Sequence, residues 1–140
     1  MRDNVWLEKR LAALWGKHFN DVPQANEIKI YFGRKAKKRL GSIREELFFA
    51  KRSQTHIKLN GHYQNVSVPD FVVDATIAHE LCHYTHGFSS PLPQIFDHPH
   101  KGDIVDEEMI KRGLGDTLLL QRDWLEKNWN ETVKHEVFKK

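Results

Sequence analysis

A strongly apolar run from residue 71 to residue 82 is the feature that most constrains what this chain can fold into. Pro69 and Asp70 supply a helix start before it, and Gly87, followed by a serine- and proline-rich stretch, supplies a stop. The run therefore predicts a buried core helix of about four to five turns. The 140 residues suit one domain, 1–140, with a hydrophobic core.

Two histidines and a glutamate interrupt this apolar helix in the pattern His79-Glu80-Leu81-Cys82-His83. Four residues are slightly more than one helical turn, so His79 and His83 share a face and can bind one Zn²⁺. Glu80 is rotated by one step, which puts its carboxylate beside the metal as a catalytic base. Buried polar groups are costly without partners, and a bound cation removes that cost.

A catalytic zinc site normally has three protein ligands and one open position. The stretch from Phe96 to Asp103 offers two histidines after a loop long enough to fold back over the motif. We predict His100, at the entrance to the next helix, as the third ligand, with His98 as the alternative. Glu107 or Glu108 would serve in a two-histidine, one-glutamate site, but their surroundings are rich in charge and favour a role at the solvated surface.

Hydrophobic periodicity outlines the other elements. Residues 3–18 have the spacing of an amphipathic helix, and short alternating segments in 28–32, 41–50 and 56–60 predict strands of a small, mainly antiparallel sheet. Further helices are expected at about 102–112 and about 116–128, followed by a charged tail. The order of helix, strands and then helices predicts an α+β domain.

Composition excludes several classes of protein. Hydrophobic content of 39% and charged content of 29% are ordinary for a globular domain. No apolar run approaches membrane-spanning length, and the N-terminus interleaves charges with apolar residues, unlike a secretory signal. The single cysteine, Cys82, excludes an intramolecular disulfide. We expect a cytoplasmic protein without a membrane partner; its oligomeric state is not predicted.

A local basic segment stands out against the formal net charge of +3. Solvation of a hairpin face is its favoured interpretation, and nucleic-acid contact is the alternative. The residues that would make this contact are Arg34, Lys35, Lys37, Lys38 and Arg39.

The segments IYFGRKAKKRLGSIR, HIKLNGHY, VPDFVVDATIAHELCHY and HPHKGD, in this order, resemble the SprT-like zinc metallopeptidase domain. The resemblance covers roughly residues 20–112, which it identifies as the core of a small zincin-like domain whose HExxH helix packs against a sheet. It implies that His79 and His83 are zinc ligands, Glu80 the catalytic acid and base, and His100 the third ligand. Lys101 replaces the family's glycine, and the cysteine zinc ribbon of many relatives is absent, which weakens an inference to DNA.

The expected function is hydrolysis of peptide bonds in a protein or peptide substrate by a zinc metallopeptidase. The alternatives are a DNA-associated binding module with a structural zinc, and a zinc hydrolase acting on a non-peptide bond. The segment HIKLN, residues 56–60, is expected to dock an extended substrate along the sheet edge. Tyr63, Tyr84 and His98 are the candidates for stabilising the oxyanion.

Overall fold

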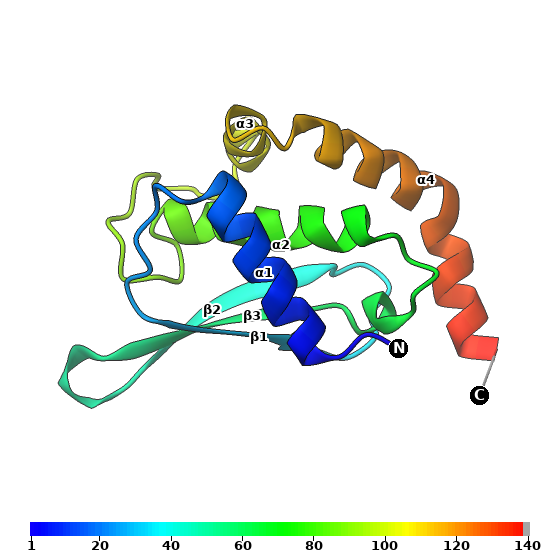
Figure 1. Cartoon of the computed structure of the whole chain (residues 1–140), viewed down its shortest axis with the longest axis horizontal. Helices are drawn as coiled ribbons and strands as arrows, with labels where there is room; N and C mark the ends of the chain where they lie inside the picture. Colours follow the sequence, from blue (N-terminus) through cyan, green and yellow to red (C-terminus); the bar gives the residue numbers. More distant parts are fainter. Residues whose placement is uncertain (139–140) are drawn as a thin grey trace.

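The computed structural model describes the backbone of residues 1–138 and the side chains of residues 1–134 (Figure 1). In chain order the elements are α1 (Asn4–His18), β1 (Glu27–Phe32), β2 (Gly41–Leu47), the short helix η1 (Phe49–Lys51), β3 (Ser53–Leu59), the short helix η2 (Gly61–Gln64), α2 (Asp70–Thr85), α3 (Ile104–Lys111) and α4 (Gly115–Phe138). The α+β class predicted from the sequence is confirmed.

The three strands form one mixed sheet in the order β1-β3-β2. β2 and β3 are antiparallel, with Ile43 opposite Ile57, whereas β1 and β3 are parallel, with Ile30 opposite Ile57. The parallel pair was not predicted, because alternation identifies a strand but not its neighbour. Residues 33–40, which carry the basic segment, are therefore not a hairpin turn but a connection that passes from β1 across to the far edge of the sheet.

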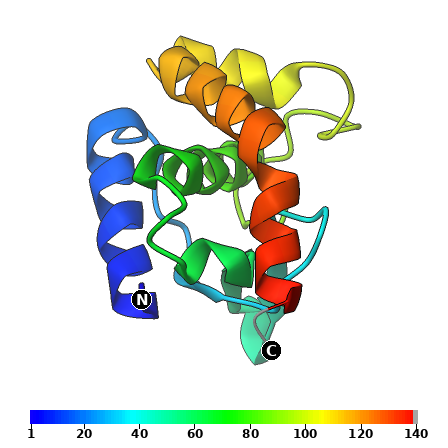
Figure 2. The same cartoon turned by 90° about the vertical axis from the view of Figure 1, so that its right-hand side faces the viewer.

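α2 is the central helix, lying against the sheet with α1 and α4 on either side (Figures 1 and 2). Its side chains are buried on nearly every face, including Val72, Ile77 and Leu81, which are at most 1% exposed. A helix that is apolar all round must be covered on all sides. The predicted core helix is thus observed, and its surroundings come from every other part of the fold.

Thr76 is the point at which three elements meet α2. Its hydroxyl oxygen lies 2.9 Å from the Tyr63 hydroxyl of η2 and accepts a hydrogen bond from the Gln121 amide of α4 at 2.8 Å. Its methyl group faces the first residue of β2, where a Cβ added to Gly41 would lie only 2.8 Å from Thr76 Cγ2. Only glycine allows the strand to approach the helix so closely.

α4 is longer than predicted: it continues past residue 128, through most of the expected charged tail, to Phe138. Trp129 explains part of this extension, since its ring packs edge-on against Tyr63 and its indole Nε1 donates to the Lys37 carbonyl oxygen at 2.6 Å. Val133, one turn later, is also buried. The polar composition after residue 128 hid this sparse apolar face. Residues 139–140 lie outside the described residues.

Within residues 1–138, the structure contains no helix of the length and apolar character needed to span a membrane.

Replacing Thr76 with valine should lower the free energy of unfolding by about 1–3 kcal/mol, because the buried Tyr63 hydroxyl loses its partner. Urea denaturation measures this change. Tyr63→Phe should destabilise the wild-type protein more than the Thr76→Val protein, since the Tyr63 hydroxyl has already lost one of its partners there. Additive effects of the two substitutions would show that the hydrogen bond does not couple the helices.

Candidate active site

The motif residues differ in exposure because they point from different faces of α2. His83 is 2% exposed and Glu80 is 5% exposed, whereas His79 is half-buried. The imidazoles of His79 and His83 lie edge to face with their ring centroids 4.9 Å apart. One turn of helix therefore brings the two rings into contact without help from a third residue.

The loop after α2 brings a third imidazole to this pair. The ring centroid of His100 lies 4.4 Å from that of His83, and Phe88 packs against both rings at 5.3 Å and 4.9 Å. His98 is exposed and makes no ring contact with the motif histidines among the described residues. The structure thus gathers His79, His83 and His100, and leaves His98 outside this cluster.

Burial favours the neutral form of the two helix histidines, His79 and His83. Burial, reinforced by the neighbouring histidines, lowers the pKa of His83 to about 3, and burial also lowers the pKa of His79. A neutral imidazole keeps a nitrogen lone pair for a metal. In addition, the buried Nδ1 of His83 has no hydrogen-bond partner among the described residues.

The donor chemistry of the three imidazoles therefore fits zinc, which binds neutral histidine nitrogen. Their present arrangement does not amount to a metal site: within the described part of the chain, no three His, Cys, Asp or Glu side chains are placed to hold one ion. His79 and His83 are fixed on a helix, while His100 is exposed on an irregular loop. Cys82 is a free, fully buried thiol whose pKa is raised by that burial, as befits a packing residue.

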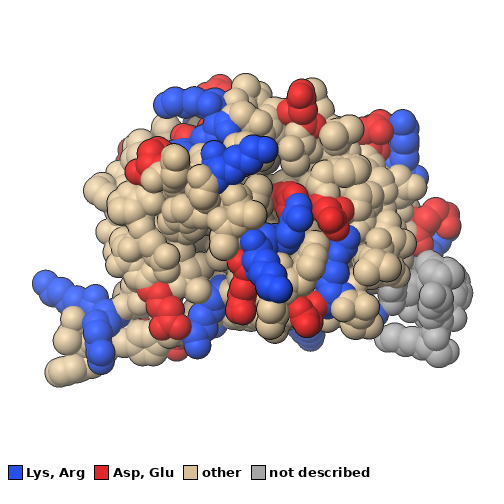
Figure 3. Space-filling model, in the orientation of Figure 1, with Lys and Arg blue, Asp and Glu red and all other residues tan. Residues whose placement is uncertain are grey.

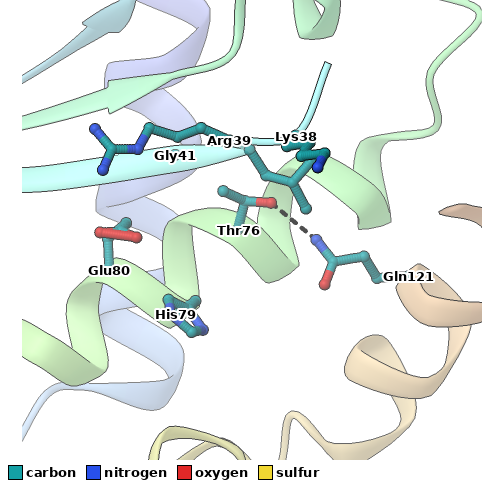
Figure 4. A pocket seen from close by; sticks show the side chains of 8 residues that line it. Lys38, Arg39, Gly41, Thr76, His79, Glu80 and Gln121 are labelled. Carbon is teal, nitrogen blue, oxygen red and sulfur yellow. Dashed lines mark hydrogen bonds between the residues drawn. The ribbon is translucent and has the colours of Figure 1, made fainter. Parts of the chain in front are cut away.

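Glu80 opens onto a pocket of about 400 Å³ between the start of β2, α2 and α4 (Figure 4). Burial raises the pKa of the Glu80 carboxyl to about 7, and the positive charge of Arg39 partly offsets this effect. A carboxyl group with such a pKa can both take and return a proton near neutral pH. The pocket is lined by Lys38, Arg39, Leu40, Gly41, Thr76, His79, Glu80 and Gln121.

Sequence reasoning did not find Thr76 and Gln121, and it treated Lys38 and Arg39 only as members of a basic segment. Their meeting at the pocket depends on contacts over about 40 to 80 residues of chain, which no local pattern encodes. Gly41, which lets β2 approach α2, was visible as a glycine at a strand start, and that was the one available signal.

Glu108 does not have the solvated role expected from its charged helix. Its side chain is only 16% exposed, and its two oxygens accept hydrogen bonds from His86 Nε2 at 2.9 Å and Arg112 Nε at 2.7 Å. Arg112 also donates hydrogen bonds to the Asp21 carboxylate and to the His18 carbonyl oxygen. Glu108 thus ties the end of α2 to α3 and to the end of α1.

Neither tyrosine suggested for the oxyanion is available. Tyr63 and Tyr84 are both fully buried. The Tyr63 hydroxyl is bonded to Thr76, and the Tyr84 hydroxyl accepts from the Ala25 amide and donates to Asn26 Oδ1. These hydroxyls are satisfied within the core, so they hold the fold and do not reach a ligand in the pocket.

The strand expected to dock substrate is also not available. β3 is the central strand and pairs with β1 on one side and β2 on the other, so residues 56–59 present no free edge. β2 is the edge strand beside the pocket.

Comparison with models of known protein families, with curated proteins and with solved structures gave no match to this chain.

Gly87→Ala should disrupt the loop that carries His100. Gly87 has φ of +78°, and a Cβ there would lie 2.2 Å from the Pro93 carbonyl oxygen. We expect a loss of more than about 1 kcal/mol in the free energy of unfolding. We also expect changed imidazole NMR signals from His83 and His100. The matched control is Gly16→Ala in α1, where no atom lies within 4 Å of the added Cβ and stability should rise by about 0.5–1 kcal/mol. Equal effects of the two substitutions would contradict this assignment.

Acid should weaken the Arg112 network. Burial opposes the charge of Glu108, but the His86 hydrogen bond and Arg112 outweigh it and hold its pKa below the ordinary value of 4.5; Arg112 likewise lowers the pKa of Asp21. The stabilisation is present above the ordinary pKa values of these two carboxyl groups. It is lost as pH falls through their lowered pKa values in the folded protein. Unfolding by urea from about pH 6 to about pH 3 should therefore show a smaller loss of stability in Arg112→Met than in wild type.

The control for this experiment is Lys127→Met, which removes an exposed pair with Asp123 and should leave the acid dependence close to that of wild type. An Arg112→Met profile parallel to the wild-type profile would show that these carboxylates gain nothing from Arg112.

Proposed function

We propose that this chain is a zinc-dependent metallopeptidase of the SprT-like type. In this proposal His79, His83 and His100 are the zinc ligands, and Glu80 is the catalytic base. The observation that supports it best is the meeting of three imidazoles with a buried glutamate whose pocket also contains His79. A purely structural histidine pair would not need a third imidazole or a base at its side.

Zinc, when bound by these imidazoles, would supply a Lewis acid and lower the pKa of an attacking water. Glu80 then takes a proton from that water as it attacks the peptide carbonyl carbon, and gives the proton to the leaving amine as the C–N bond breaks. Its burial suits both steps, because a carboxyl with a pKa of about 7 is nearly balanced between its two forms at neutral pH.

An extended peptide can align on β2, the edge strand. The Ser89 hydroxyl donates to the Ile43 carbonyl oxygen at 3.3 Å, so the Ile43 carbonyl points to this outer edge, and a peptide that paired with it would replace Ser89. Strand alternation directs the backbone groups of Gly41, two residues earlier, to the same edge, next to the pocket. Backbone pairing of this kind favours a peptide over other acyl substrates, which would gain nothing from a strand edge.

The nucleic-acid alternative rests on residues 34–39, and charge alone supports it. Figure 3 shows positive and negative side chains interspersed on the face that α1 covers, so this face lacks the broad positive surface that favours nucleic-acid binding. Lys38 and Arg39 moreover line the pocket beside Glu80. We therefore assign Lys38 and Arg39, and not the rest of the basic segment, to substrate binding.

The ligand set and the base are tested together by zinc content per chain and by cleavage of an unfolded protein. Glu80→Gln should keep one zinc per chain and lose turnover by a factor of about 10² or more. His79→Ala and His100→Ala should lose zinc as well as activity, because each removes one of three ligands.

His98→Ala is the matched control, since it changes a histidine of the same loop and should keep both zinc and cleavage. Zinc lost in His98→Ala and kept in His100→Ala would contradict the ligand assignment. Wild-type protein that binds zinc and cleaves no peptide would contradict the peptidase assignment.

A further inference from the structure

The pocket beside Glu80 has two cations on its wall that form no ion pair with any described residue. Lys38 and Arg39 line it, and Glu80 is the one carboxylate among the described lining residues. Both cations are exposed, and neither makes an ion pair or a side-chain hydrogen bond with another described residue. In Figure 4 the Arg39 side chain extends along β2 on the side of the helix that carries Glu80.

The side-chain donors of Thr76 and Gln121 in the pocket are already committed. The Thr76 hydroxyl is shared between Tyr63 and Gln121, and the Gln121 amide nitrogen also donates to the Val72 carbonyl oxygen at 2.9 Å. His79 and Glu80 belong to the proposed reaction. Lys38 and Arg39 are therefore the groups left to recognise a ligand, with Leu40 as an apolar wall.

The backbone that carries these cations is held in place from two sides. Buried Asn60 donates from its amide to the carbonyl oxygens of Ala36 and Arg39, both at 2.8 Å, and Trp129 donates to the Lys37 carbonyl oxygen. A fixed backbone reduces the entropy lost when the side chains engage a ligand. If residues 34–39 were only a solvated surface connection, their backbone would not need these three hydrogen bonds.

We propose that this pocket binds an acidic side chain, Asp or Glu, of the substrate next to the peptide bond that is cleaved. Arg39 and Lys38 bind its carboxylate, and Leu40 contacts its methylene groups. The inference rests on the proposed peptidase function and adds the class of substrate to it: peptides with an acidic residue at one defined position.

The test uses C-terminally amidated peptides in which Glu and Gln are exchanged at one position at a time around the cleaved bond. The wild-type protein should prefer Glu over Gln by about tenfold or more in kcat/KM at a single position, as a charge-assisted ion pair implies. Arg39→Gln should reduce this ratio several-fold, and Arg39→Glu should invert it in favour of Gln. Lys37→Gln, which removes a charge of the same segment outside the pocket, should leave the ratio unchanged.

A binding measurement separates this inference from the proposed function. Fluorescence anisotropy of labelled Glu and Gln peptides on the zinc-loaded Glu80→Gln variant should show the same preference without turnover. If no peptide is cleaved but the Glu peptide still binds better, the pocket assignment stands and the peptidase assignment fails.

Three results would overturn the inference: no preference at any position, a preference spread evenly over all positions, or an equal reduction by Lys37→Gln. A preference that appears only when the peptide has a free C-terminus would assign the pocket to the terminal carboxylate, and would likewise contradict the inference.

Discussion

The hydroxyl group of Thr76 is the contact on which the rest of this structure depends. It joins η2 and α4 to the middle of α2, while the methyl group on the same Cβ sets the distance to β2 at Gly41. His79 and Glu80 follow three and four residues later on the same helix. The position of the proposed base relative to the pocket wall is therefore fixed by a neutral residue that takes no part in the chemistry.

The sequence predicted the elements of the fold better than their partners. The helix expected at 3–18 is Asn4–His18, and the core helix is Asp70–Thr85, because both have strong apolar patterns and clear ends. The parallel pairing of β1 with β3 was missed, since it depends on a crossover that no local signal specifies. The length of α4 was missed because Trp129 and Val133 are too sparse to be recognised as an apolar face.

The candidate site was likewise predicted in part, with its local spacing recognised and its long-range contacts missed. The spacing of His79, Glu80 and His83 was readable because all three are on one helix. The choice between His98 and His100 could not be made from spacing in the same way, since it depends on the path of an irregular loop. Gly87 and the Phe88 ring set the direction of this loop. The pocket wall was the part that the sequence predicted least, because the start of a strand, a helix and a segment far along the chain form it together.

The hydrogen bond from Trp129 to the Lys37 carbonyl oxygen bears on what the smallest functional unit of this chain is. The SprT-like resemblance ends at about residue 112, and a chain shortened to that boundary would keep every histidine and the glutamate of the motif. It would lose Gln121, which lines the pocket, and Trp129, which anchors the segment that carries Lys38 and Arg39. Under the proposed function, such a fragment would retain the proposed zinc ligands and base but hold Lys38 and Arg39 less firmly, so the proposed catalysis and the proposed selectivity would have different boundaries along this chain.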